Sequence, residues 1–512
     1  MSRNWSVDDL NKSSKFFPES VFATPKSGYD LLPFRHISLP NIPRQILLTS
    51  PVGEYMFISE HDFSKLQSHD LTKNSDLYRA LRTRQIVCDE EHGPFLNGIA
   101  AQHATRKLHV HEDPALHIFV VTLRCDHRCH YCQVTPRHLE EGGWDMNQET
   151  ALAALDRVFE SQAECLTIEF QGGEAAVSFN IVRLVVEAAE DRVRQTTQSV
   201  RFVLTSTLHL LTDEMLVFCR DHKIELSTSL DGPSCVHNFN RINASTNSYE
   251  KTLEAIARAR DICGHDSVSA LTTITRRSLK YPCEIVDTYK NLGFASISAR
   301  PLSPFGFAVK SWGKIGYTAE EYLSFYRELL AHLIDVNLQG TFLEETYATL
   351  LLTRILTPFP TAYVDLQSPS GAGSNVLVYN YDGGVYVSDE ARMLAEMGDG
   401  RFRMGSVHDE LDILRNSKAM NIVHSGGTAE NNPKCSECAF VPYCGADPIF
   451  NVATQGDPMG DHTESEFCRR HTGLFEVIFE YLENRDPEIM RVFLSWIGRR
   501  NISEIPVPGY LG

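Results

Sequence analysis

The sequence lacks a hydrophobic run of membrane-spanning length, and Met1 to Lys15 lack the apolar core of a signal peptide. It also lacks a long basic run, and its formal net charge is −18 with a pI of about 5.6. These absences argue against a membrane protein and a non-specific nucleic-acid binder. We therefore expect a cytoplasmic protein that has no membrane and no nucleic acid among its partners.

Because export signals are lacking, the 13 cysteines are expected to be metal ligands and buried thiols rather than disulfides. Seven of them form two groups: Cys125, Cys129 and Cys132, then Cys435, Cys438, Cys444 and Cys468. The length of 512 residues and the hydrophobic content of 42% predict a globular protein of two or three domains.

The first cysteine group follows an apolar run, Leu116 to Leu123, that is typical of a buried strand. The thiols therefore lie at the carboxyl end of a strand, where α/β proteins place their chemistry. Three close thiolates suit a soft metal centre, and a fourth ligand is lacking because Cys165 lies in an apolar run that predicts a core position. An open metal position favours catalysis. A zinc knuckle or three unrelated thiols is the alternative.

Strand and helix patterns alternate from Leu116 to about Gly340. Helical stretches such as Glu149 to Phe159 and Ile181 to Arg194 separate six apolar runs, which begin near Leu116, Leu166, Val200, Ile224, Val268 and Ala295. Such alternation predicts an α/β fold with a parallel sheet, either doubly wound or a partial barrel.

The spacing C-x3-C-x2-C, with Tyr131 before the last cysteine, resembles the radical S-adenosylmethionine (SAM) enzymes. In that family SAM chelates the open iron through its amino and carboxylate groups. The resemblance implies a partial (β/α)6 TIM-like barrel over residues 111–340. It also implies two cofactors, SAM and a [4Fe-4S] cluster on Cys125, Cys129 and Cys132, and a contact of Tyr131 with the adenosyl part of SAM.

Two further motifs match the family. Gly172-Gly173-Glu174 follows the second strand, where paired glycines allow a close backbone approach and a carboxylate can accept bonds from an ammonium group; alone, Gly-Gly more often marks a tight turn. The resemblance implies that this motif holds the SAM amino group and that Ser229 and Arg241 contact SAM. Thr205-Ser206-Thr207 departs from the family's Thr-Asn and offers hydroxyls but no amide.

The second cysteine group lies beyond a predicted hairpin, Val376 to Ser388, in a further domain over residues 341–480. Its four thiolates can close a site for zinc or for an iron-sulfur cluster. The arrangement resembles the SPASM extension of radical SAM peptide maturases, which implies one auxiliary [4Fe-4S] cluster on Cys435, Cys438, Cys444 and Cys468. A second auxiliary cluster is not expected, because Ser368, Ser388-Asp389 and Pro448 stand where relatives have its cysteines.

Residues 1–33 are interpreted as a flexible leader, residues 34–110 as a small α+β module and residues 481–512 as a helical tail. The module has a hairpin from Gln45 and helical patterns near His61 to Leu71 and Ser75 to Val87. It resembles the winged-helix peptide-recognition element of peptide-modifying enzymes, which binds a leader peptide by strand addition. A structural cap is the alternative.

Residues 34–468 resemble one branch of the family, the His-Xaa-Ser system radical SAM maturase B. The resemblance is carried by the runs Arg300-Pro-Leu-Ser-Pro, Tyr363-Val-Asp-Leu, Tyr379-Asn-Tyr-Asp-Gly and Cys444-Gly-Ala-Asp-Pro. It implies a peptide or small-protein substrate with His-Xaa-Ser repeats, a partner radical SAM maturase and an electron donor such as flavodoxin or ferredoxin. Oxidation of a serine or cysteine, as in anaerobic sulfatase maturases, and a non-catalytic metal-binding scaffold are the alternatives.

Overall fold

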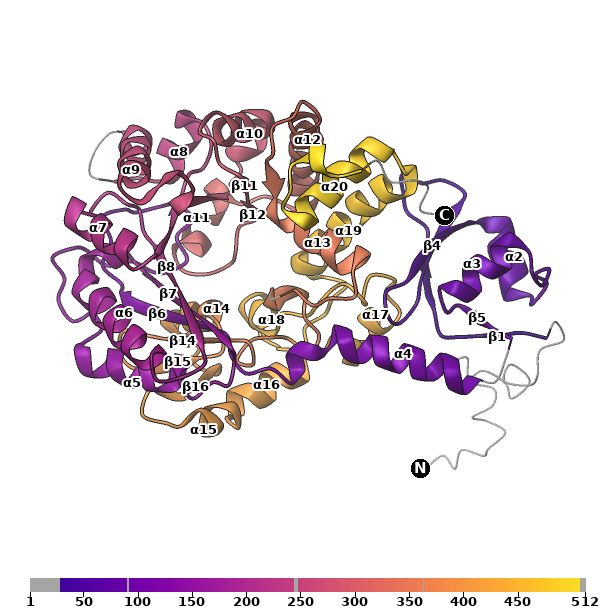
Figure 1. Cartoon of the computed structure of the whole chain (residues 1–512), viewed down its shortest axis with the longest axis horizontal. Helices are drawn as coiled ribbons and strands as arrows, with labels where there is room; N and C mark the ends of the chain where they lie inside the picture. The colour runs from indigo at the N-terminus through magenta and orange to yellow at the C-terminus, as the bar shows by residue number, and fades with distance from the viewer. Residues whose placement is uncertain (1–27, 90–91, 244–246, 362, 507–512) are drawn as a thin grey trace. The chain divides into compact units, whose positions relative to one another are not determined.

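The computed structural model describes residues 28–89, 92–243, 247–361 and 363–506 (Figure 1). The chain divides into a smaller unit, Met1–Arg106 with Glu437–Pro442, and a larger unit formed by the rest. Most of the predicted leader, residues 1–27, lies outside the described residues. The predicted boundaries after residues 110, 340 and 480 stay predictions.

The smaller unit confirms the predicted hairpin and its two helices. Its strands and helices are β1 (Asp30–Leu31), β2 (Arg35–Ile37), β3 (Gln45–Thr49), β4 (Tyr55–Ser59), α2 (Glu60–Gln67), α3 (Asp76–Thr83), β5 (Val87–Cys88) and α4 (His92–Arg106). Strands β2, β3 and β4 form an antiparallel sheet, and the Ser59 and Ser75 side chains cap α2 and α3. Thr49 Oγ1 donates to Ala439 O at 2.8 Å, which ties the segment 437–442 to this unit.

The larger unit is built on one mixed sheet. In spatial order its strands are β12 (Ala299–Arg300), β10 (Val268–Thr273), β9 (Glu225–Ser229), β8 (Ser199–Thr205), β7 (Cys165–Gly172), β6 (Leu116–Thr122), β14 (Val376–Tyr379), β15 (Gly384–Tyr386) and β16 (Arg403–Ser406). Strands β6 to β10 and β12 run parallel at the six predicted places. Within the described residues the sheet does not close, so the expected partial barrel is confirmed.

The prediction that Cys165 lies in the core was wrong, because this side chain is exposed. Cys165 is the first residue of β7, and the side chains of a strand point alternately to its two faces. Leu166, Ile168 and Phe170 take the buried face, which leaves Cys165 on the other.

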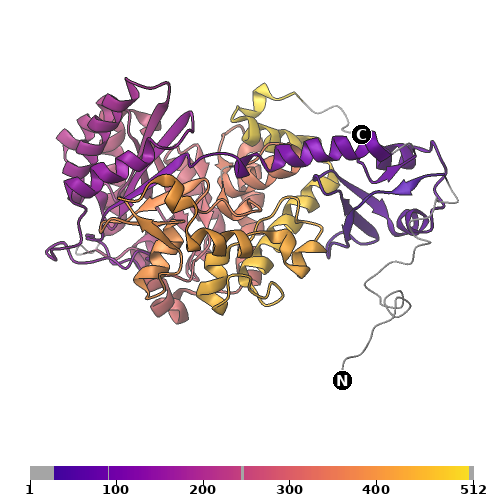
Figure 2. The same ribbon diagram turned by 90° about the horizontal axis from the view of Figure 1, so that it is seen from below.

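The helices that follow the parallel strands cover the outer face of the sheet (Figures 1 and 2). They are α5 (Gln148–Val158), α6 (Phe179–Val193), α7 (Asp213–Asp221), α9 (Ser248–Cys263) and α10 (Pro282–Asn291). Helix α6 buries Val182, Val185, Val186 and Ala189, the spacing of one helical face. The predicted helices near residues 149–159 and 181–194 are thus confirmed as α5 and α6.

The C-terminal hairpin extends the same sheet. Strands β14 and β15 flank Asp382-Gly383-Gly384 as predicted, and β14 pairs parallel with β6, with Val376 opposite Leu116. Four more helices pack against one another: α12 (Ala319–Leu338), α13 (Thr346–Leu356), α19 (Glu466–Asn484) and α20 (Pro487–Gly498). No described helix combines the length and the apolar character needed to cross a membrane.

Candidate functional site

The three-cysteine loop, Cys125 to Cys132, begins three residues after β6 ends. The Cys125 amide donates to Arg137 O at 3.0 Å, and the Cys132 amide donates to Cys129 O at 3.1 Å. Burial raises the pKa of all three thiols, that of Cys129 to about 12, and the charge of a neighbouring cysteine raises the pKa values of Cys125 and Cys129 further. Because the thiols repel each other's ionised forms, they fit a cationic metal centre that would hold them as thiolates.

Gly172-Gly173-Glu174 lies directly against the chain that leads into this loop. The Gly173 amide donates to Thr122 O at 2.8 Å, and the Glu174 amide donates to Arg124 O at 2.7 Å. A Cβ on Gly172 would collide with the Thr122 carbonyl oxygen, and a Cβ on Gly173 would collide with that of Arg124. Glycines are therefore required at this contact between two strand ends, and the motif lies beside the start of the loop, at Cys125.

The Glu174 carboxylate is completely buried and fixed by three hydrogen bonds. Oε1 accepts from the Ser206 hydroxyl at 2.6 Å and from the Ala176 amide at 3.0 Å, and Oε2 accepts from the Thr207 amide at 2.6 Å. Burial raises the pKa of Glu174. Ser206 and Thr207 thus orient this carboxylate.

Tyr131 and Arg241 meet in the interior. Arg241 Nη1 donates to the Tyr131 hydroxyl at 2.9 Å, and that hydroxyl donates to Asp231 Oδ1 at 3.2 Å. Burial raises the pKa of Asp231 to about 6. Ser229, the last residue of β9, lies two positions before Asp231. Tyr131 and Arg241, predicted to contact SAM, are thereby brought together within one buried network.

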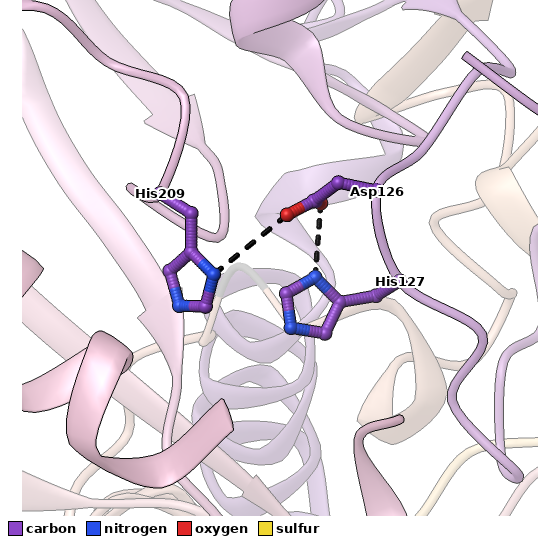
Figure 3. A group of neighbouring side chains, drawn as sticks. All are labelled: Asp126, His127 and His209. Carbon is purple, nitrogen blue, oxygen red and sulfur yellow. Dashed lines mark hydrogen bonds and ion pairs between the residues drawn. The ribbon is translucent and has the colours of Figure 1, made fainter. Parts of the chain in front are cut away.

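Asp126, His127 and His209 form a second polar group (Figure 3). His127 Nδ1 lies 2.9 Å from Asp126 Oδ1, and His209 Nδ1 lies 3.7 Å from Asp126 Oδ2. Asp126 Oδ1 lies 3.8 Å from Cys125 Sγ. One ligand atom from each of the three residues falls within 4.8 Å of the others, a spacing that a metal ion can bridge.

Both ring nitrogens of His127 nevertheless have hydrogen-bond partners within the protein. The Asp231 amide donates to His237 Nδ1 at 3.3 Å, so the neutral His237 ring carries its proton on Nε2, 3.3 Å from Ser248 Oγ. The Ser248 hydroxyl is then free to donate to His127 Nε2 at 3.0 Å, and His127 Nδ1–H donates to Asp126. This series of hydrogen bonds could not be predicted from the sequence, because no local pattern joins residues that are far apart in it.

A cavity of about 810 Å³ lies against strands of the sheet in the larger unit. Gln171, which precedes the Gly-Gly motif, and Phe305 both line it. Phe305 lies two residues before Phe307, and the Phe307 amide donates to Cys132 O at 2.8 Å. Arg300 lines the cavity, and its Nη2 lies 3.4 Å from Glu390 Oε1. Six further charged residues line it: Glu112, Glu169, Asp365, Asp389, Asp447 and Arg470.

The four residues of the second cysteine group come from two segments of the division described above. Cys435, Cys444 and Cys468 belong to the larger unit and Cys438 to the smaller one. Cys435 Sγ lies 3.0 Å from Nδ1 of the buried His462, a residue that the sequence analysis did not single out although it precedes Cys468 by only six positions. That the four cysteines bind one auxiliary cluster stays a prediction.

Two proteins of known sequence are similar to part of this chain. An uncharacterised protein of Methanothermobacter thermautotrophicus is 26% identical over 234 residues, which cover 44% of this chain and 80% of that protein. An uncharacterised protein of Methanocaldococcus jannaschii is 23% identical over 188 residues, 36% of this chain, and the match spans 62% of the relative's length.

Two solved structures share the fold. One is anSMEcpe with bound AdoMet, with a TM-score of 0.60 and 18% identity over 72% of this chain and 98% of that chain. The other is SuiB of Streptococcus suis bound to its precursor peptide SuiA, with a TM-score of 0.52 and 15% identity over 87% of this chain and 99% of that chain.

The family model described as the radical SAM superfamily matches residues 119–289. This range contains the three-cysteine loop, Gly172-Gly173-Glu174, Ser229 and Arg241. Residues 119–289 of this chain therefore form a radical SAM domain.

Proposed function

We propose that this chain is a radical SAM enzyme that modifies a peptide or small protein after its synthesis. The observation that carries the proposal is the position of a loop with three thiols beside the fixed carboxylate of Glu174 and next to residues that line a large cavity. Cys125, Cys129 and Cys132 would hold a [4Fe-4S] cluster. When bound, the cluster and SAM supply the reductive cleavage of SAM to methionine and a 5′-deoxyadenosyl radical.

The chain's own residues would bind and orient SAM. Glu174 presents its carboxylate to the SAM amino group, and the hydrogen bonds from Ser206 and Thr207 hold it in place. Tyr131 would contact the adenosyl part. Arg241, held by the Tyr131 hydroxyl, and Ser229 would contact SAM from the strand end of β9.

The cavity supports a peptide substrate. Its volume of about 810 Å³ lies in the upper part of the usual range for ligand sites and accommodates a few extended residues. The fold is shared with SuiB, which binds the precursor peptide SuiA, and with anSMEcpe, which binds the Kp18Cys peptide. We infer a cytoplasmic maturase for a His-Xaa-Ser repeat peptide, working with a partner radical SAM maturase and with an electron donor such as flavodoxin or ferredoxin.

The decisive experiment reconstitutes the protein without oxygen, adds dithionite and SAM, and measures 5′-deoxyadenosine by mass together with iron per chain. A variant with Cys125, Cys129 and Cys132 replaced by alanine is the control and should yield no deoxyadenosine. A fully iron-loaded wild-type protein that yields none, with or without the peptide, would contradict the proposal and favour a scaffold.

A second experiment addresses the auxiliary [4Fe-4S] cluster on Cys435, Cys438, Cys444 and Cys468. Replacing Cys435 and Cys438 by alanine should remove about half of the bound iron if two four-iron clusters are present. An unchanged iron content would show that these cysteines hold no cluster.

Oxidation of a serine or cysteine side chain is the second candidate reaction, because Gly172-Gly173-Glu174 and the spacing of Ser229 and Arg241 also resemble the patterns of anaerobic sulfatase maturases. The two reactions are separated by incubating the enzyme with a His-Xaa-Ser peptide and with a peptide that has a single cysteine and no histidine. Loss of two hydrogens from the cysteine of the second peptide would favour the oxidation.

A further inference from the structure

The surroundings of the three-cysteine loop differ in charge from the rest of the chain. The sequence contains 66 aspartate and glutamate residues, yet the segments 127–139, 232–243, 267–283 and 301–319 contain none. Hydrogen bonds join these segments: Arg128 N donates to Ile242 O at 2.7 Å, Phe307 N donates to Cys132 O at 2.8 Å, and Thr275 Oγ1 donates to Asn240 Oδ1 at 3.0 Å. These four segments therefore carry no negative side chain, and the acidic residues near the loop, Asp126, Glu174 and Asp231, all lie outside them.

Four exposed cations form what we call the cationic face: Arg128, Arg277, Lys310 and Lys314. The Lys314 ammonium donates to His130 Nε2 at 2.9 Å, and both Lys314 and Arg277 lie over the ring of Phe239, at 4.8 Å and 5.0 Å from its centre. Among the described residues none of the four cations has an aspartate or glutamate oxygen within 4.0 Å, so their charge is not neutralised.

Exposed apolar side chains accompany these cations. Ile242, whose carbonyl binds the Arg128 amide, is 44% exposed, and Val309 and Trp312, on the helix that carries Lys310 and Lys314, are 44% and 39% exposed. Unpaired charges of one sign next to exposed apolar side chains are typical of a surface that docks a partner transiently. The apolar component favours a protein partner over a nucleic acid.

We propose that the cationic face docks an acidic electron-transfer protein that reduces the cluster held by Cys125, Cys129 and Cys132. This inference rests on the proposed function, which requires a reductant. One electron passes from the partner's redox centre to the cluster, the partner is oxidised by one electron, and no bond is made or broken. Lys314 touches His130, which lies between Cys129 and Cys132, so a partner held at Lys314 comes close to the thiols.

The experiment compares two reductants of the iron-loaded protein. The first is a photoreduced, acidic bacterial flavodoxin, and the second is uncharged photoreduced 5-deazariboflavin. The test variant carries Arg277→Glu, Lys310→Glu and Lys314→Glu, and the matched control is Lys418→Glu, an exposed lysine at the start of α16 (Lys418–Gly426). Cluster reduction is followed by stopped-flow absorbance at low and at high salt.

We expect the triple variant to be reduced by flavodoxin roughly tenfold or more slowly at low salt and to lose the salt dependence of that rate. Reduction by 5-deazariboflavin, and the deoxyadenosine formed with it, should stay unchanged, and Lys418→Glu should behave as wild type. Equal flavodoxin rates in the triple variant and wild type would overturn the inference, as would binding of a DNA oligonucleotide without binding of flavodoxin. A wild-type protein that makes no deoxyadenosine with 5-deazariboflavin would instead refute the proposed function.

If the triple variant loses iron, the single variant Lys310→Glu is used to test the docking face. The Lys310 ammonium lies over the Phe307 ring at 5.8 Å, and the hydrogen bond to His130 comes from Lys314, so this substitution leaves that bond in place. A normal flavodoxin rate in an iron-loaded Lys310→Glu protein, at low salt, would then count against the docking face.

Discussion

At the scale of single residues, Glu174 is held in one position by its hydrogen bonds. Its two oxygens accept three hydrogen bonds inside the protein, and two of these come from backbone amides that only an oxygen can satisfy. A glutamine at this position would turn its NH₂ group toward one of the donors and leave that donor unpaired.

We therefore expect Glu174→Gln to lower the free energy of unfolding by about 1–3 kcal/mol and to weaken SAM binding. Urea unfolding and equilibrium dialysis with SAM measure the two effects. Glu169→Gln is the matched control, because Oε1 of Glu169 accepts from the Thr205 hydroxyl and a glutamine oxygen can do the same. A larger loss of stability in Glu169→Gln than in Glu174→Gln would contradict the prediction.

Asp365, which lines the cavity, should make stability depend on pH. Burial raises the pKa of its carboxyl to about 6, and the charge of Glu390 adds to the increase. The carboxyl of the unfolded chain ionises near pH ~4, so between about pH 4 and pH 6 the folded protein binds more protons than the unfolded one. Stability from this group therefore falls as pH rises through that window, and the loss persists above it.

The variant Asp365→Asn removes this contribution. Its unfolding free energy is measured with urea at several pH values. We expect the difference between the variant and the wild type to change in favour of the variant as pH rises from about 4 to about 6. Curves that stay parallel across this window would show that the Asp365 carboxyl titrates at its ordinary pKa.

At the scale of elements, the turn after β7 and the chain after β6 support each other. Gly173→Ala would push a methyl group into the Arg124 carbonyl, which is backbone and cannot move aside. We expect a loss of about 2–4 kcal/mol in unfolding free energy and fewer iron atoms per chain, because the displaced segment carries Cys125. Gly142→Ala is the control, since nothing lies within 4 Å of its added carbon. Equal iron content in both variants would refute the coupling.

The sequence predicted those elements whose pattern is local. The six parallel strands, helices α5 and α6 and the two hairpins follow from apolar periodicity and from turn residues such as Asp382-Gly383-Gly384. The side of the sheet on which β14 adds could not be predicted, because the pairing of Val376 with Leu116 joins residues far apart in the sequence. The motif residues Tyr131, Glu174 and Arg241 were found by their spacing, whereas Asp231, His237 and Ser248 were missed because their sequence surroundings resemble ordinary turns and helix starts.

At the scale of the whole molecule, the two units have separate hydrophobic cores. Leu81 is completely buried in the core of the smaller unit, together with Leu48, Leu66 and Ile86. Leu81→Ala should destabilise that unit by about 2–5 kcal/mol through the lost contacts and the cavity left behind.

Differential scanning calorimetry should show two transitions, and Leu81→Ala should shift only one of them. Leu204→Ala, at a completely buried position in β8, should shift the other. A single transition that moves in both variants would show that the chain unfolds as one cooperative body.

The bond between Thr49 and Ala439 also governs the order in which the protein can be made. It joins residues 390 positions apart, so the smaller unit leaves the ribosome in two portions, Met1–Arg106 first and Glu437–Pro442 much later. All six parallel strands of the larger unit emerge in between. The N-terminal hairpin must therefore wait, without its last segment, until translation has passed Pro442, and Cys438 arrives with that segment.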